Sequence, residues 1–281
     1  MDMNSYETSC NICSDSKLHI SKTIISPDRF ESHTQNGVQY QERYWAQCSS
    51  CEAYVNLMNK KARLALEEIS TDYYQIDFGD IDLVERFQKI MSLPKIGSDN
   101  TLRVERACSL LSDMLSSSSK SLKVLDFGSG LGVFPALLLE KAGEIGLDLN
   151  LHVVETDKNA LSVLDNIKNI NIHPGLYNAD EHGKYDAIFL NKVLEHIKNP
   201  ISLLIDLKNN LAHQGLIYIE VPNHLNINRP TSDNAFSSLH YNFYNKSTFE
   251  FIGHEIELKL KNYVDIKEPS GKDTCYGVFA R

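Results

Sequence analysis

Four of the six cysteines stand in two close pairs, and each pair has two residues between its thiols. That spacing lets one tight turn present two sulfurs to the same ion, and two such turns complete the tetrahedral four-sulfur shell that Zn²⁺ favours. Because four thiolates leave no open coordination position, we expect a structural zinc ion bound by Cys10, Cys13, Cys48 and Cys51. Disulfides and a redox pair are the alternatives, and the apparent reducing compartment and the lack of a thioredoxin-like βαβ setting disfavour them.

A glycine-rich loop is the second chemical signal. The segment Asp126-Phe-Gly128-Ser129-Gly130-Leu-Gly132 follows an apolar strand and precedes a helix, so the backbone can bend sharply and a ligand can approach without intervening side chains. A dinucleotide loop has the spacing Gly-X-Gly-X-X-Gly, whereas here the third glycine comes one residue earlier and an acid precedes the first. This pattern argues against NAD, and the Asp126 carboxylate favours a cofactor that carries an α-amino group and a sulfonium.

Glu155 ends the next apolar strand, about twenty residues after the glycine loop. At that distance a doubly wound fold brings an acid to the ribose hydroxyls of a bound nucleoside. A solvated surface carboxylate is the alternative, and it fits Glu155 less well than Asp157, which could simply cap the following helix. We therefore predict that Glu155 anchors an adenosine group.

These residues lie on a regular alternation of strands and helices. Strands are predicted at 122–127, 151–155, 185–190 and 216–221, and helices at 133–141, 158–167 and 200–211. Buried-type strands that alternate with helices predict a Rossmann-like, doubly wound and mostly parallel sheet covered on both faces. Two more strands, near 258–265 and 274–280, are expected to pair as a hairpin on the sheet edge.

The upstream half has a different character. Helices are predicted at 60–69, at 81–91 and from about residue 101, and residues 14–47 are expected to form an inserted hairpin or loop between the cysteine pairs. We expect a zinc module over residues 1–58, a helical linker or lid over 59–119 and the cofactor-binding domain over 120–281. The lone Cys108 and Cys275 are expected to be packed residues.

Composition limits the possible functions. The 281 residues are 42% hydrophobic, which suffices for one large domain and a smaller one. No apolar run approaches the roughly 20 residues that span a bilayer, and residues 1–9 lack the features of a secretory signal, so we expect a cytoplasmic protein. The net charge of -9 and the lack of a dense basic tract disfavour nucleic acid and favour a small polar acceptor. We find no sequence signal for an oligomeric state.

Five ordered segments resemble the signature segments of S-adenosylmethionine-dependent class I methyltransferases. They are Asp126–Gly132, Val154–Glu155, Tyr185–Leu190, Val193–His196 and Gly215–Asn223. The paired cysteines, followed by two adjacent tyrosines and then this domain, are further similar to sugar-modifying methyltransferases of natural-product and surface-polysaccharide pathways. The resemblance covers roughly residues 122–223 and implies S-adenosylmethionine as the cofactor.

The resemblance also assigns cofactor contacts. It implies that the glycine loop holds the methionine end, that the acid after the second strand holds the ribose, and that residues at the end of the fourth strand line the cofactor. Asp180 is the nearest candidate for an adenine contact, although its surroundings depart from the usual strand-then-acid pattern. The cofactor-binding residues expected are Tyr74, Asp126, Gly128, Ser129, Gly130, Glu155, Thr156, Asp180, Leu190 and Asn191.

The acceptor's proton needs a base, and two histidines are candidates. An unperturbed imidazole has a pKa near 6.5, close enough to working pH to take a hydroxyl proton as the bond to the methyl group forms. His240 is preferred over His196 because the stretch Ser238–Phe243 resembles the segment that borders the substrate pocket in related enzymes. The alternatives are a turn-capping role for His196 and a surface or substrate-bonding role for His240.

The acceptor expected is a hydroxyl of a sugar, sugar nucleotide or surface-polysaccharide precursor. Sugar C-methyltransferases of the similar group usually continue into a sizeable further C-terminal domain, whereas this chain ends at Arg281, which favours methylation at oxygen. A sugar C-methyltransferase, an RNA methyltransferase with zinc knuckles and a noncatalytic S-adenosylmethionine-binding protein remain as alternatives.

Overall fold

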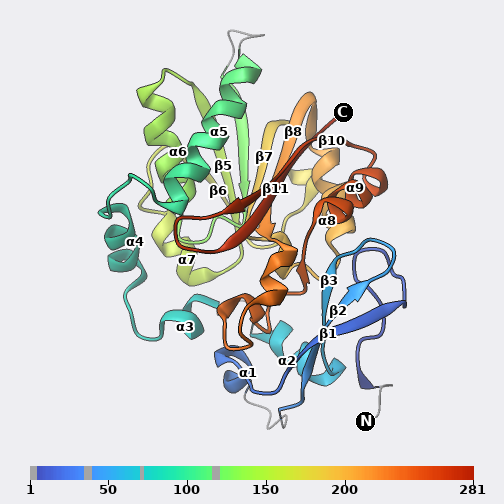
Figure 1. Cartoon of the computed structure of the whole chain (residues 1–281). Coiled ribbons are helices and arrows are strands. Elements are labelled where there is room, and N and C mark those ends of the chain that lie inside the picture. The colour runs from blue at the N-terminus through green and yellow to red at the C-terminus, as the bar shows by residue number, and fades with distance from the viewer. Residues whose placement is uncertain (1–4, 35–39, 70–72, 116–120) are drawn as a thin grey trace.

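The computed structural model describes residues 5–34, 40–69, 73–115 and 121–281. Within them, a seven-stranded sheet has the order β10-β11-β8-β7-β4-β5-β6 (Figure 1). Its strands are β4 (Leu122–Phe127), β5 (Leu149–Glu155), β6 (Ile170–Pro174), β7 (Tyr185–Asn191), β8 (Leu211–Pro222), β10 (Lys259–Lys267) and β11 (Asp273–Ala280). The five from β6 to β8 run parallel, and the hairpin of β10 and β11 joins the β8 edge antiparallel. The predicted Rossmann-like architecture and edge hairpin are confirmed.

Helices cover both faces of this sheet. Neighbouring residues of a strand point to opposite sides, so apolar residues in succession along a strand pack against helices on the two faces. On β4, Val124 packs with α5 (Asp99–Leu115) and α6 (Val133–Glu144). Leu125, the next residue, lies in the cluster of α8 (Pro200–Asn209) and α9 (Lys246–Glu255) on the other face. Burial on both sides explains why these strands are nearly continuous apolar runs.

Element bounds differ from the sequence predictions in a few places. The helix predicted at 158–167 is α7 and ends at Leu164, and the strand predicted at 216–221 begins already at Leu211. The sequence reading missed β6, a short strand at the sheet edge, and the six-residue helix α3 (Tyr73–Phe78). Both are too short to show a periodic apolar pattern, and α3 has no fully buried residue.

The N-terminal part has its own four-stranded sheet, in the order β1-β2-β3-β9. Strands β1 (Leu18–Ile24) and β2 (Arg43–Cys48) form the predicted hairpin between the cysteine pairs, with α1 (Arg29–His33) in their connection. The other strands are β3 (Tyr54–Leu57) and β9 (Asn242–Phe243). Because β9 comes from the opposite end of the chain, the cysteine-bearing sheet is completed by the cofactor-domain region.

Side-chain contacts reinforce this junction. Trp45 of β2 stacks on Phe243 of β9 with ring centroids 4.0 Å apart, and the Thr248 hydroxyl donates to the Cys51 carbonyl at 2.9 Å. The division at residues 58/59 thus separates segments that pack on each other, and it stays a prediction. The division at 119/120 falls outside the described residues.

A helical segment leads from this sheet to the large one. It comprises α2 (Lys60–Glu68), α3, α4 (Leu83–Met91) and α5. Side chains of α3 and α4, Phe78 and Phe87 among them, pack against Val163 of α7. The part of the segment formed by α3 and α4 therefore lies beside the carboxyl ends of β4 and β5, where the glycine loop and α7 begin. Among the described residues, no helix is both long and apolar enough to cross a bilayer.

Candidate active site

A cavity of about 740 Å³ opens at the carboxyl ends of β4, β5 and β7. The chain order reverses between β4 and β7, since β5 lies on one side of β4 and β7 on the other. Such a switch point is where open α/β sheets bind their ligands. The wall at one end of the cavity is formed by Tyr74, Gly128, Ser129, Gly130, Glu155, Thr156, Asp157 and Asn191. Most of the cofactor contacts expected from the sequence therefore meet at one place.

The glycine loop takes a backbone shape that other residues would strain. Gly130 has a φ of 56°, in the left-handed region, and a Cβ at this position would lie 2.2 Å from the Tyr74 hydroxyl oxygen. Gly128 has a φ of 71°, and its Cβ would lie 2.7 Å from Val193 Cγ2. At both positions a side chain would be strained by the positive φ and would come too close to a neighbouring side chain, so glycine is favoured. Tyr74, carried by α3, lies directly over the loop.

Glu155 ends β5 with both carboxylate oxygens bound by backbone amides. Its Oε2 accepts from Gly130 N at 2.6 Å, and its Oε1 accepts from the amides of Thr156 at 2.7 Å and Asp157 at 2.9 Å. The side chain is buried at 7% exposure, yet it borders the cavity. These bonds hold the carboxylate in one position at the edge of the cavity.

Asp157 has the capping role considered from the sequence and a second one. Its Oδ1 accepts from Asn159 N and Ala160 N at the start of α7. Its Oδ2 accepts from Tyr74 N at 3.3 Å. The start of α7 therefore holds the start of α3 in place over the glycine loop.

Three expected cofactor contacts do not border the cavity. Asp126 is 1% exposed and lies behind the loop, where its Oδ1 accepts from Asn191 Nδ2 at 3.3 Å. Leu190 is fully buried in the core on the α8 side of the sheet. Asp180 lies in the single turn η3 (Ala179–Glu181), away from the cavity wall. Of the two residues expected at the end of β7, Asn191 alone reaches the wall.

The other end of the cavity holds the two candidate histidines. His196 ends the turn η4 (Leu194–His196) after β7, and His240 lies just before β9. Their rings are 4.8 Å apart between centroids. Burial lowers the pKa of His196 to about 3 and that of His240 to about 4. The ordinary imidazole pKa near 6.5, on which the sequence argument for a base depended, therefore does not apply here.

Glu195 is a cavity residue that the sequence reading did not single out. It is 2% exposed, and its Oε2 has no hydrogen-bond partner among the described residues. Burial raises the pKa of this carboxyl to about 7. The sequence signal that could have identified Glu195 is its position directly before a candidate histidine and shortly after a buried strand.

Buried ion pairs support the wall between the two ends. Arg103 of α5 donates to Glu220 Oε1 at the end of β8, with Nη2 at 2.5 Å. Burial alone would raise the pKa of Glu220, but Arg103, Lys192 and Arg106 lower it to about 2. Lys192 in turn pairs with Glu268 at 3.3 Å. No local sequence pattern indicates this network, because its members come from four separate parts of the chain.

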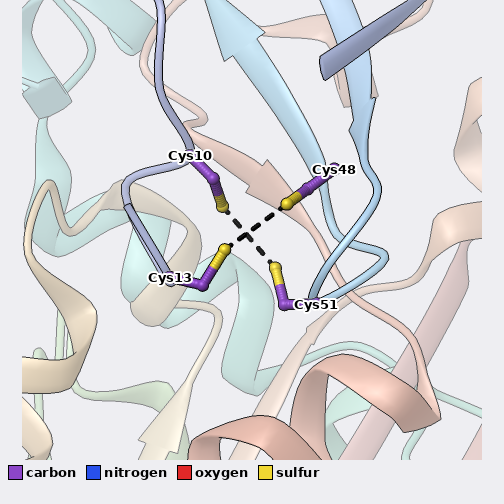
Figure 2. Close-up of side chains that lie close together, drawn as sticks. All are labelled: Cys10, Cys13, Cys48 and Cys51. Carbon is purple, nitrogen blue, oxygen red and sulfur yellow. Dashed lines mark hydrogen bonds between the residues drawn. The ribbon is translucent and has the colours of Figure 1, made fainter. Parts of the chain in front are cut away.

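The four paired cysteines form one cluster at the base of the β1-β2-β3-β9 sheet. Figure 2 shows all four sulfurs pointing to a common centre. The Sγ atoms of Cys10 and Cys51 are 3.6 Å apart, and those of Cys13 and Cys48 are 3.4 Å apart. No disulfide links the cysteines within the described part of the chain. Sulfurs bound tetrahedrally to zinc at about 2.3 Å are roughly 3.8 Å apart, so the cluster fits a zinc ion closely. The lone Cys108 and Cys275 are buried, as predicted.

Comparison with known proteins identifies the class. Residues 100–261 match a protein family described as Methyltransferase domain. The matched span is more than half of the chain and includes the glycine loop, Glu155 and Glu195. The chain belongs to this family, and it is an S-adenosylmethionine-dependent methyltransferase. A search of curated protein sequences gave no match.

Solved structures share the fold at low sequence identity. Magnesium protoporphyrin IX methyltransferase (ChlM) from Synechocystis PCC 6803 with bound SAH is 12% identical with a TM-score of 0.52, over 76% of this chain and 100% of that one. The 1,6-didemethyltoxoflavin-N1-methyltransferase from Burkholderia thailandensis is 13% identical with a TM-score of 0.51, over 86% and 96%. The plantazolicin methyltransferase BpumL is 14% identical with a TM-score of 0.52, over 76% and 97%.

Proposed function

We propose that this methyltransferase transfers the methyl group of S-adenosylmethionine to a hydroxyl of a sugar, sugar nucleotide or surface-polysaccharide precursor. The observation that carries the proposal is the polar wall of the cavity. Leu66, Pro222, Ala235 and Leu239 are the only aliphatic side chains on it among the described residues. The rest are charged residues, amides and hydroxyl-bearing side chains, three tyrosines among them, together with two histidines and two glycines, and this number of hydrogen-bonding groups suits a sugar with its many hydroxyls.

The cofactor occupies the end of the cavity beside β4 and β5 in this proposal. The amides of the glycine loop meet the methionine part, and the fixed carboxylate of Glu155 accepts from the ribose hydroxyls. Tyr74 covers the cofactor from α3. Asp126 acts from behind the loop, where its negative charge attracts the α-amino group and the sulfonium without a place on the wall.

The reaction needs little chemistry from the protein beyond alignment. The sulfonium already activates its methyl group, so the enzyme must hold the acceptor oxygen in line with the carbon–sulfur bond and exclude water. In this proposal His196 and His240, which both line the cavity, contact the acceptor hydroxyl. Because their pKa values are low, they stay neutral at physiological pH and serve to position groups better than to take a full proton.

The four-cysteine cluster has a structural role in this proposal. A zinc ion there would join the turn at Cys10 to the turn at Cys51, whose carbonyl accepts the Thr248 hydroxyl of α9. The same sheet places His240, because Asn56 of β3 donates to the His240 carbonyl at 2.8 Å. The ion would therefore stabilise the acceptor end of the cavity without contacting it.

Transfer of label from methyl-labelled S-adenosylmethionine tests the proposal. The full chain is incubated with nucleotide sugars, free sugars, amino sugars and RNA, and products are identified by mass spectrometry. We expect label on a sugar oxygen, at a rate that Glu155→Gln lowers at least about 10-fold through weaker cofactor binding. Label on RNA, on an amino group or on carbon would contradict the proposed acceptor, and unchanged cofactor affinity in Glu155→Gln would contradict the ribose contact.

A further inference from the structure

Three side chains at the acceptor end of the cavity form a cluster of metal-ligand type. Glu195, His196 and His240 each offer one ligand atom, and these atoms lie within 4.8 Å of one another. The cluster joins two segments far apart in sequence, the turn after β7 and the stretch before β9. A backbone hydrogen bond from Tyr241 N to the Glu195 carbonyl, 2.7 Å long, fixes the two segments together. The arrangement is therefore built into the fold.

The imidazoles are oriented as metal-binding histidines usually are. His240 Nδ1 lies 2.9 Å from the Ala235 carbonyl oxygen, so it carries the proton and leaves Nε2 with a free lone pair. The Leu239 backbone raises the pKa of His196 against the effect of burial, as a carbonyl oxygen close to the ring does. In a metal-bound histidine, the ring nitrogen that does not bind the metal usually donates its N–H to a backbone carbonyl, which fixes the ring and its tautomer.

Glu195 supplies an independent observation. Its carboxylate is 2% exposed, and its Oε2 has no partner among the described residues. The nearest lysine of the segment, Lys192, is engaged with Thr274 at 2.5 Å and Glu268 at 3.3 Å. A buried carboxylate oxygen without a partner is costly. A cation between Glu195 and the two imidazoles would relieve that cost.

We propose that Glu195, His196 and His240 bind a divalent first-row transition ion, distinct from the ion of the four-cysteine cluster. Two imidazoles and one carboxylate form a ligand set that suits Zn²⁺, Fe²⁺, Co²⁺ or Mn²⁺ and leaves coordination positions open. Ligands on one ion at about 2.1 Å lie at most roughly 4.2 Å apart. Every pair here lies within 4.8 Å, so none needs to approach by more than about 0.6 Å to meet that limit, which side-chain rotation supplies.

The open positions would face the cavity, beside the place where the methyl group is transferred. There the ion would hold an acceptor oxygen and lower the pKa of its hydroxyl, a role that rests on the proposed function. Metal binding itself does not depend on the identity of the acceptor, so it can be tested separately.

Co²⁺ is the probe, added to the full chain after incubation with one equivalent of Zn²⁺ to load the cysteine cluster. Cobalt bound by nitrogen and oxygen gives visible d–d bands, whereas cobalt on thiolates adds intense near-ultraviolet charge-transfer absorption. We expect one further equivalent of Co²⁺ with d–d bands and without the thiolate absorption. Absence of binding, or a spectrum dominated by thiolate absorption, would overturn the proposal.

Variants locate the ion. Glu195→Gln and His240→Gln keep the size of the side chain, and each should weaken Co²⁺ binding at least about 100-fold. His254→Ala is the matched control, because His254 lies exposed on α9 and outside the cavity, and its Co²⁺ affinity should equal that of the parent. S-adenosylmethionine binding in the same samples checks that the variants are folded. Equal Co²⁺ affinity in folded Glu195→Gln and in the parent chain would refute the site.

Discussion

Asp126 offers a substitution whose effect on stability can be worked out from its burial. The side chain is 1% exposed, and its Oδ2 has no partner among the described residues. Burial raises the pKa of this carboxyl from 3.8 to about 7, and the charge of Glu155 adds to the rise. The folded protein therefore pays a free-energy cost for the ionised form above pH 7, while the unfolded chain does not.

The sign follows from proton binding. Between pH 4 and pH 7 the folded state holds more protons at this site than the unfolded state, so stability falls as pH rises through that window. A shift of about three pH units corresponds to about 4 kcal/mol at full ionisation. Asp126→Asn removes the charge at constant size. The free energy of unfolding of Asp126→Asn minus that of the parent should therefore increase by between about 2 and 3 kcal/mol from pH 5 to pH 8.

Urea unfolding of both chains at pH 5, 6, 7 and 8 measures the difference. Other pH-dependent groups, the cysteine cluster included, are common to both and cancel. Asp206→Asn, at an exposed position of α8, is the matched control, and its effect should stay small throughout. If Asp126→Asn differs from the parent by the same amount at pH 5 and pH 8, the carboxyl does not titrate in the way its burial implies. Calorimetry on the same samples should show weaker S-adenosylmethionine binding, as expected for a carboxylate kept for function.

Three further substitutions test other parts of the structure. Gly130→Ala places a Cβ 2.2 Å from the Tyr74 hydroxyl at a φ of 56°, so calorimetry should show at least about 10-fold weaker cofactor binding, and unchanged binding would contradict the need for a bare backbone there. Cys48→Ser should lower the zinc content by one ion per chain and the free energy of unfolding by several kcal/mol; an unchanged metal content would contradict the four-sulfur site. Arg103→Met leaves the buried Glu220 with one arginine fewer, so urea unfolding should show a loss of about 3 to 5 kcal/mol, and a loss below about 0.5 kcal/mol would show that Arg106 suffices.

Local patterns in the sequence predicted much of the framework. The strands β4, β5 and β7 are short apolar runs bounded by turn residues, and each was placed to within two residues. The glycine loop and the paired cysteines could be read directly, because their chemistry depends on residues close together in the chain. Spacing along the chain also related Glu155 to the loop, since consecutive parallel strands end at the same edge of the sheet.

The acceptor end of the cavity was less accessible to such reasoning. His196 and His240 are recognisable as candidates from the sequence. Their contact with each other, however, joins positions that are 44 residues apart, with the whole of β8 and the turns after it in between. Their low pKa values arise from burial by several elements. Neither property has a signature in the residues next to each histidine.

The sequence by itself determined which strands and turns form, because hydrophobic periodicity, glycine spacing and thiol spacing act over a few residues. Tertiary structure decided that β9 completes the cysteine-bearing sheet, that Tyr74 lies over Gly130, and that Asp126 stands behind the loop. These contacts depend on how distant segments pack. Burial and the electrostatic field of a site are sums over all the groups around it, and those groups are brought together only by the fold.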